Sequence, residues 1–379
     1  MLLVLFSYGL LHSQEAKPPI MGWSSWNNFH VHIDEKMIRE QADAIVSSGL
    51  YEAGYRYVNI DDGYFGGRDS AGNLYPDSTK FPSGMKALAD YIHGKKLKAG
   101  IYTDAGANTC GSIYDKDEKG VGVGIYGHID QDCNIFFNTW GYDFLKVDWC
   151  GAKKMKLNEE AEYTKISKAV KAINKDLVYT ICRWEFPGVW AIDKADSWRI
   201  SSDIRPEFSS VLKIIDLNAN LYKYSSAGHY NDMDMLQVGR GMSYDEDKTH
   251  FSMWCMMNSP LLAGNDLRKM SKETIEILTN KEVIALNQDK GFYQARRIFK
   301  KGSIEVWEKL LGKEGKKGTA IAIMNRGGKT TSFDLKPASV HHKESTKIRD
   351  LWSHQSLGKI GKIRKFEIPK HGIVVLKTE

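Results

Sequence analysis

Cysteine is scarce in this 379-residue sequence, which contains five. An odd count leaves at least one cysteine without an intramolecular partner, and no C-x-x-C spacing occurs. This excludes a zinc ribbon and a dense disulfide framework, and leaves room for one disulfide in an exported protein. The sequence also lacks an H-E-x-x-H pattern and a P-loop pattern. We therefore expect no metal site and no cofactor.

Long hydrophobic runs are also rare. Only residues 2–11 (LLVLFSYGLL) form a largely apolar stretch, which is too short to span a bilayer and has the length of a signal-peptide core. The sequence predicts a signal peptide over residues 1–17, and hence an exported protein, periplasmic or extracellular. The usual preceding basic residues are missing, so an amphipathic first helix is the alternative.

The sequence has no strong excess of one charge. The net charge is +6 at pH 7, and the Lys and Arg residues are scattered, with some density after residue 299. Short basic stretches of this kind are typical of a solvated face. We therefore expect no nucleic-acid partner.

Short apolar runs alternate with helical patterns from residue 18 to residue 295. Strands that alternate with helices indicate a parallel sheet, and eight such units predict an α/β fold of the (β/α)8 TIM-barrel type. A doubly wound open sheet is the alternative, but MGWSSWNNF is not the glycine-rich turn that would follow its first strand. The predicted strands are residues 20–23, 55–61, 97–104, 144–149, 177–184, 197–201, 228–233 and 259–264.

The pattern changes in residues 296–379. Runs such as SIEVWEKL, GTAIAIMN and GIVVLK are short, alternate between apolar and polar residues, and are separated by Gly, Lys and Asn. This pattern predicts an antiparallel β-sandwich domain that follows the barrel.

Polar side chains gather where the predicted strands end. Chemistry in a barrel occurs at the C-terminal ends of its strands, so these positions form the candidate site. They include no three-histidine cluster of the kind that binds a catalytic metal. The residues are Trp23, Trp26, Asp61, Asp62, Tyr102, Asp104, Lys146, Asp148, Arg183, Trp184, Arg199, Asp203, Asp232 and Asp234.

Carboxylates interleaved with aromatic residues favour a sugar site. Aromatic faces pack on a pyranose ring, charged groups bind its hydroxyls, and cleavage of a glycosidic bond needs two carboxyl groups. Each carboxylate alone also has a structural interpretation, since Asp104 and Asp232 suit helix N-caps or turns. The repetition at equivalent strand ends is what favours the site.

Several longer motifs carry a family resemblance. They are spread over nearly all of residues 18–379, and the sequence resembles the retaining α-galactosidases and α-N-acetylgalactosaminidases of glycoside hydrolase family 27. The motifs are MGWSSWNNF, NIDDGYF, FPSGMKALADYIHGKKLKAGIYTDAG, FLKVDWC, WRISSDI, YNDMDMLQVG, SPLLAGNDLR, EVIALNQD and RDLW…HGIVVLK.

The resemblance implies a role for each matching residue. It makes Asp148 the nucleophile and Asp203 the general acid/base, and it makes Cys110 and Cys150 a disulfide beside the pocket. Cys182 lacks its usual partner, because Ala195 stands near that position. The implied sugar contacts are Trp26, Asp61, Asp62, Tyr102, Lys146, Arg199 and, with a less defined role, Asp234.

Arg183 departs from the family pattern. The motif after the fifth strand lies near the sugar's C2 substituent and is acidic in familiar α-galactosidases, but small in the N-acetylgalactosaminidases. Here it is CRWEF. A long cation suits a 2-hydroxyl better than an acetamido group, which favours galactose; the alternative is that Arg183 pairs with a structural acid such as Glu185.

The expected function is hydrolysis of terminal α-D-galactosyl residues from an oligosaccharide, polysaccharide or glycoconjugate. An α-N-acetylgalactosaminidase is the first alternative, and a non-catalytic carbohydrate-binding protein on the same scaffold is the second. The sequence also predicts that Lys146, on the same strand face, lowers the pKa of Asp148 and keeps it ionised. Asp203 has the opposite task, because a general acid must hold a proton near neutral pH.

Overall fold

The computed structural model describes residues 16–379. The predicted signal peptide lies almost entirely in residues 1–15, outside the described residues. No helix in the described part of the chain is both long and apolar enough to cross a membrane.

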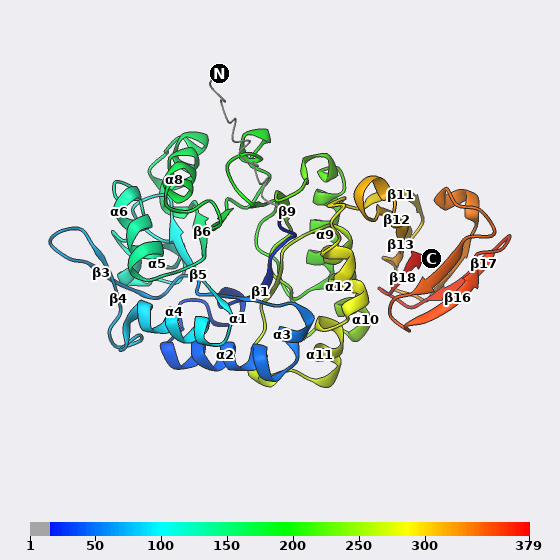
Figure 1. Cartoon of the computed structure of the whole chain (residues 1–379), viewed down its shortest axis with the longest axis horizontal. Helices are drawn as coiled ribbons and strands as arrows, with labels where there is room; N and C mark the ends of the chain where they lie inside the picture. The colour runs from blue at the N-terminus through cyan, green and yellow to red at the C-terminus, as the bar shows by residue number, and fades with distance from the viewer. Residues whose placement is uncertain (1–15) are drawn as a thin grey trace, which may run out of the picture.

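Eight parallel strands form the barrel of the first domain (Figure 1). Each predicted strand is present, the first shifted by one residue and the other seven with shorter bounds. Their order in the sheet is β10-β1-β2-β5-β6-β7-β8-β9. A parallel bridge between Leu236, just after β9, and Ala263 of β10 closes the sheet into a barrel. This excludes the doubly wound alternative. The bounds are β1 Met21–Ser24, β2 Tyr57–Asn59, β5 Lys98–Asp104, β6 Phe144–Asp148, β7 Val178–Ile181, β8 Ser197–Arg199, β9 Tyr230–Asp232 and β10 Leu261–Ala263.

Amphipathic helices cover the outside of the barrel. In α2 the apolar residues Ile38, Ala42 and Ile45 are buried at helical spacing, and Asp34 caps the helix by accepting a hydrogen bond from Met37 N. The longer helices are α2 Glu35–Ser47, α4 Gly84–Gly94, α8 Glu159–Ile173, α9 Phe208–Asn218, α10 Tyr244–Met256, α11 Lys272–Leu278 and α12 Lys281–Asn287. The shorter ones are α1 Trp26–Phe29, α3 Leu50–Ala53, α5 Cys110–Tyr114, α6 Ile129–Cys133 and α7 Cys150–Lys154.

Two features of the barrel differ from the regular alternation of strands and helices. The connection from β7 to β8 contains only a 3-10 turn, Val189–Ala191, and no α-helix. A hairpin of β3 (Phe65–Arg68) and β4 (Leu74–Pro76) also extends from the segment after β2. The sequence did not predict this hairpin, because Gly66 and Gly67 are residues that are depleted in strands.

The C-terminal domain is antiparallel, as predicted. A six-stranded sheet in the order β11-β12-β13-β18-β15-β16 faces the pair β14-β17, and apolar residues such as Val306, Ile323 and Leu335 fill the space between them. The other face of the large sheet packs on the barrel through Trp307. The strands are β11 Arg296–Lys301, β12 Ile304–Leu310, β13 Thr319–Asn325, β14 Thr331–Leu335, β15 Lys347–Asp350, β16 Gln355–Lys359, β17 Arg364–Ile368 and β18 Ile373–Thr378.

Candidate active site

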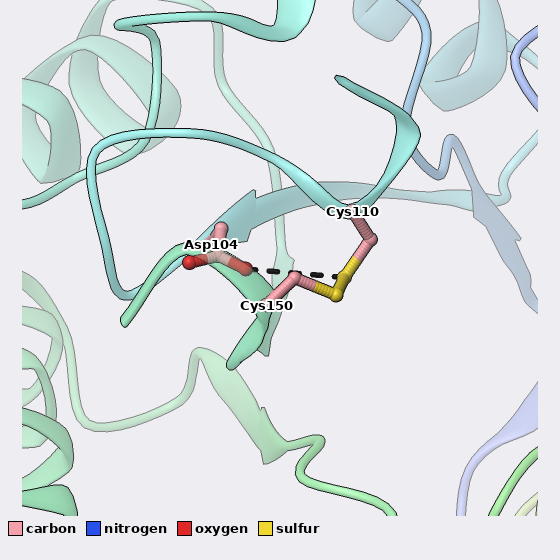
Figure 2. Close-up of side chains that lie close together, drawn as sticks. All are labelled: Asp104, Cys110 and Cys150. Carbon is pink, nitrogen blue, oxygen red and sulfur yellow. Dashed lines mark hydrogen bonds between the residues drawn. A yellow bond between two sulfur atoms is a disulfide. The ribbon is translucent and has the colours of Figure 1, made fainter. Parts of the chain in front are cut away.

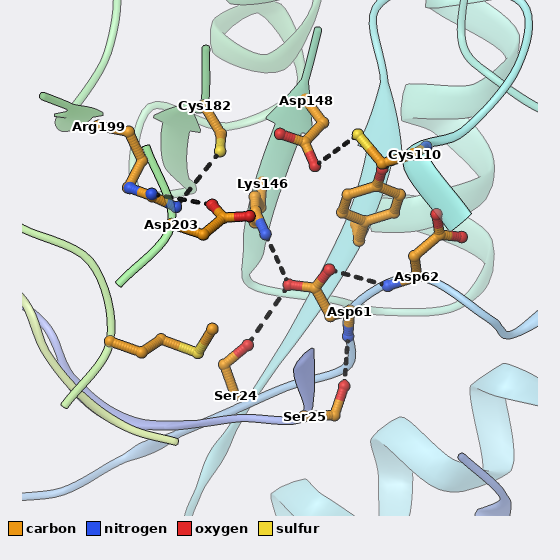
Figure 3. Close-up of polar contacts among 12 residues, drawn as sticks. Ser24, Ser25, Asp61, Asp62, Cys110, Lys146, Asp148, Cys182, Arg199 and Asp203 are labelled. Atoms are coloured by element: carbon orange, nitrogen blue, oxygen red, sulfur yellow. Dashed lines mark hydrogen bonds and ion pairs between the residues drawn. The ribbon is translucent and has the colours of Figure 1, made fainter. Parts of the chain in front are cut away.

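The carboxyl ends of the barrel strands bring together most of the predicted site residues (Figure 3). A narrow cavity runs along the barrel axis, from Ile20 and Phe144 at the strand starts to the polar strand ends. Six of the predicted strand-end residues line it: Asp61, Tyr102, Lys146, Arg199, Asp232 and Asp234. The predicted residues outside its lining are Trp23, Trp26, Asp62, Asp104, Asp148, Arg183, Trp184 and Asp203.

Asp61 and Lys146 form the ion pair in the floor of this site. Lys146 Nζ donates to Asp61 Oδ2 at 2.8 Å, and Ser24 Oγ lies 3.5 Å from the same oxygen. Burial by itself lowers the pKa of Lys146, but the charges of Asp61 and Asp148 outweigh it and raise the pKa well above its usual value. Lys146 is therefore a fixed cation between two carboxylates.

Asp62 behaves differently from its neighbour Asp61. It is fully buried and accepts hydrogen bonds from the backbone N–H groups of Gly63 and Gly111 at 2.8 and 2.7 Å. Burial raises its pKa to about 7 despite these bonds. Asp61 therefore binds Lys146, whereas Asp62 binds the backbone at the start of α5.

Asp148 ends β6, and the residue is 5% exposed to solvent. Its Oδ1 has no hydrogen-bond partner among the described residues. Burial raises the pKa of Asp148 to about 6, although Lys146 and the Cys182 thiol lower it. Lys146 therefore lowers the pKa as predicted, but removal of the carboxylate from water outweighs the nearby cation, so the overall pKa is raised and not lowered.

Cys110 and Cys150 form the disulfide that the resemblance implied. Figure 2 shows Asp104 beside it, and Figure 3 shows Asp148 beside Cys110. Cys110 Sγ lies 3.9 Å from Asp104 Oδ2 and 3.2 Å from Asp148 Oδ2. A disulfide sulfur carries no proton, so these are close contacts and not hydrogen bonds. The bonded sulfurs also offer no thiolate to a metal ion.

Asp104 anchors the loops around this disulfide. Its buried carboxyl group accepts hydrogen bonds from the backbone of Gly106, Gly151 and Ala152. Burial and then the charge of Asp148 raise the pKa of Asp104 to about 7. Asp104 therefore holds the N-terminal turn of α7, which agrees with its structural interpretation.

Arg199 connects the acidic residues on the opposite side of the site. Its Nη2 lies 3.0 Å from Asp203 Oδ1, 2.9 Å from Asp234 Oδ2 and 3.0 Å from the Ser201 carbonyl. Asp234 also accepts from Ile204 N at 2.8 Å, which fixes the chain next to Asp203. The Asp203 side chain itself is 54% exposed. Arg199 therefore fixes one carboxylate oxygen of Asp203, while the rest of the side chain is open to solvent.

Tyr102 and Trp26 occupy different positions. Tyr102 is buried, its hydroxyl accepts from Cys110 N at 3.2 Å, and its ring lies 5.4 Å from Lys146 Nζ. Trp26 is partly exposed and packs on His30, with ring centroids 4.9 Å apart. Tyr102 thus belongs to the floor of the site, while Trp26 packs outside the cavity lining.

Two family descriptions match the chain. "Alpha galactosidase A" matches residues 18–289, and "Alpha galactosidase C-terminal beta sandwich domain" matches residues 301–378. The chain belongs to the α-galactosidases of glycoside hydrolase family 27.

Individual members of the family agree with this assignment. The chain is 41% identical to "Alpha-galactosidase A" of Cellvibrio japonicus, over 96% of this chain and 92% of that protein. It superposes on the crystal structure of α-galactosidase I from Mortierella vinacea with a TM-score of 0.87 and 32% identity, covering 95% and 96% of the two chains. The chain also superposes on the structure of the α-galactosidase from Saccharomyces cerevisiae with raffinose. The TM-score is 0.82 and the sequence identity 25%, over 96% of this chain and 97% of that chain.

Arg183, which departs from the family pattern, forms ion pairs with two acids. Its Nε pairs with Glu159 of α8, and its Nη2 lies 2.8 Å from Glu185. The pairing with Glu185 is the alternative that the sequence left open, whereas Glu159 lies 24 residues away in the chain. Phe186 stacks on Tyr224, with centroids 4.8 Å apart.

Sequence reasoning missed two residues of this family member's site. Ser24 ends β1 and contacts Asp61, and its position at a strand end was the available signal. Cys182 follows β7 and lies between Asp148 and Arg199 (Figure 3). The missing disulfide partner of Cys182 was noted from the sequence, but its place beside Asp148 depends on the closed barrel.

Proposed function

We propose that this protein is a retaining exo-α-galactosidase that releases terminal α-D-galactosyl residues. One observation carries the proposal: a buried carboxylate, Asp148, ends β6 in the same cluster of strand-end side chains as a second carboxylate, Asp203 (Figure 3). Retaining glycoside hydrolysis requires two carboxyl groups at one site. Family membership supports the choice of an α-galactoside.

In the first step Asp203 donates its proton to the glycosidic oxygen while an Asp148 oxygen attacks the anomeric carbon. The bond to the leaving group breaks, and a covalent galactosyl ester forms on Asp148. In the second step Asp203 accepts a proton from water, and the water oxygen attacks the same carbon. The ester bond breaks, Asp148 returns as a carboxylate, and galactose leaves with its original anomeric configuration.

The floor of the pocket suits a hexose. We propose that Asp61, Lys146 and Asp62 contact the 4- and 6-hydroxyl groups, that Tyr102 and Arg199 add contacts, that Asp234 orients Arg199, and that Trp26 forms an aromatic wall. Charge-assisted hydrogen bonds of this kind are the strong ones. Because a yeast family member was solved with raffinose, small α-galactosyl oligosaccharides are suitable first substrates.

Specificity at C2 is assigned to Arg183. Its two ion pairs use Nε and one N–H of Nη2, so three of the five guanidinium N–H groups remain to bind a 2-hydroxyl. We propose that Glu159 and Glu185 hold Arg183 in this role. An α-N-acetylgalactosaminidase is the alternative, in which the larger acetamido group would need the space beside Arg183.

The test compares hydrolysis of 4-nitrophenyl α-D-galactopyranoside with that of the matching α-N-acetylgalactosaminide. Fast cleavage of the first and negligible cleavage of the second is the expected result. The reverse preference would identify an α-N-acetylgalactosaminidase, and sugar binding without turnover would identify a non-catalytic lectin-like protein.

We also propose a catalytic domain over residues 18–295, a β-sandwich domain over residues 296–379, and export after removal of residues 1–17. The Cys110–Cys150 disulfide supports export, because disulfides persist in oxidising compartments. Mass spectrometry of the protein secreted by an expressing cell would locate the first residue of the mature chain.

A further inference from the structure

Cys182 is a free, buried cysteine whose position is fixed by its backbone. It follows β7, is 1% exposed, and forms no disulfide. Its N–H donates to the Val147 carbonyl at 2.9 Å, and its own carbonyl accepts from the Tyr163 hydroxyl at 3.1 Å. These bonds hold both sides of the residue, so the direction of the short side chain is set by the barrel.

The Cys182 sulfur lies between Asp148 and the Arg199 guanidinium, which binds Asp203. Arg199 Nη1 donates to Cys182 Sγ at 3.7 Å, and the same guanidinium binds Asp203 through Nη2. On its other side the thiol faces the Asp148 carboxyl group (Figure 3), and it lowers the pKa of Asp148, although burial raises that pKa more. Figure 3 shows the sulfur between the Asp148 carboxyl and the Arg199 guanidinium.

Asp148 has few other proton donors. Its Oδ1 has no partner that meets a hydrogen-bond geometry among residues 16–379, and its Oδ2 contacts the protonless sulfur of Cys110. Lys146 acts on it only through charge, because its described hydrogen bond goes to Asp61. The S–H of Cys182 is thus a side-chain donor that can turn toward Asp148.

We propose that Cys182 is a positioning residue, whose thiol accepts from Arg199, donates to Asp148, and so orients the nucleophile relative to the acid/base. This inference rests on the proposed roles of Asp148 and Asp203. The resemblance implies that relatives have a disulfide at this position. The proposed positioning role therefore applies to this chain, in which Cys182 is a free thiol. The other titratable or charged groups that act on Asp148 or are acted on by it are Asp61, Tyr102, Asp104, Lys146, Tyr163 and Asp203.

The test compares Cys182→Ala with Cys182→Ser in the full-length protein. Serine keeps a short donor and acceptor, whereas alanine removes both. In Cys182→Ala we expect the acidic limb of the kcat/KM profile to move up by about half to one pH unit and kcat to fall about tenfold, with KM little changed. Cys182→Ser should keep the wild-type limb and most of kcat.

Cys133 supplies the matched control, since it is also buried and free but lies on α6. Cys133→Ala should leave the pH profile unchanged. Equal profiles for wild type, Cys182→Ala and Cys182→Ser would overturn the proposal and make Cys182 a space-filling residue. Melting temperatures identify a variant that fails to fold, in which case Cys182→Thr replaces it. A wild type without α-galactosidase activity would instead overturn the proposed function.

Discussion

Lys146 Nζ donates a 2.8 Å hydrogen bond to Asp61 Oδ2 at the carboxyl ends of the barrel strands. Lys146 lies on β6 and Asp61 follows the end of β2, and β5 separates these two strands in the sheet. The ion pair therefore spans the floor of the pocket. The same lysine also acts through charge on Asp148, so one cation serves a proposed sugar ligand and the proposed nucleophile.

Lys146→Met should lose about 30-fold or more in kcat/KM, because truncating one partner of a buried ion pair costs about 2–5 kcal/mol. The wild-type acidic limb should lie near the Asp148 pKa of about 6, and the limb of the variant should lie higher. Steady-state kinetics from pH 4 to 9 measure both effects. Lys86→Met is the control, since its pair with Asp90 is exposed. An unshifted limb would contradict the electrostatic role of Lys146.

Asp148→Asn should abolish turnover, retain galactose binding, and stabilise the fold. The folded-state pKa of Asp148 is raised from 3.8 to about 6, so the folded protein resists its ionisation. The resulting penalty is absent near pH 4, grows as the pH rises, and is complete above about pH 6. The variant should therefore gain about 1–3 kcal/mol at pH 7 and little at pH 4.

Thermal melts at the two pH values measure this difference, and Asp90→Asn, on an exposed carboxylate, is the control. Equal effects of Asp148→Asn at both pH values would mean that burial of the charge is not what destabilises the wild type.

Asp203→Ala should affect substrates according to their leaving groups. A sugar leaving group needs its oxygen protonated, so raffinose-type substrates should lose about 10²–10⁴-fold in kcat/KM. The dinitrophenolate of a dinitrophenyl galactoside leaves without protonation. The kcat/KM for this substrate, which reports the first step, should therefore fall far less. The ratio of the two losses is the measurement. A ratio near one would assign Asp203 a structural role at Arg199.

Arg183→Ser should lower kcat/KM for α-galactosides about ten- to hundredfold, because it removes one charge-assisted hydrogen bond of about 1.5–3 kcal/mol. Part of the loss should appear in kcat, since the contact at the 2-hydroxyl strengthens in the transition state. Glu185→Gln, at an exposed partner, should have a smaller effect. If Arg183→Ser lowers only the melting temperature and leaves the galactoside to N-acetylgalactosaminide ratio unchanged, Arg183 serves the ion pairs alone.

The strand order and the candidate site could be predicted largely from local pattern. β6 is apolar up to Asp148 apart from Lys146, and this pattern places a carboxylate at a strand end. What could not be predicted depends on contacts distant in sequence. The pKa of Asp148 reflects burial by neighbouring strands, and Arg183 finds Glu159 on a helix that precedes β7. The partners of a buried charge are set by tertiary packing.

The most direct test of the account is covalent trapping of the nucleophile. A 5-fluoro-α-D-galactosyl fluoride, whose glycosyl-enzyme turns over slowly, should label the active protein. Trypsin after reduction releases residues 147–153 (VDWCGAK), in which Asp148 is the sole carboxylate side chain. The account predicts that this peptide gains the mass of one fluorogalactosyl group, and that Asp148→Asn gains none. A label on any other peptide of the active protein would contradict it.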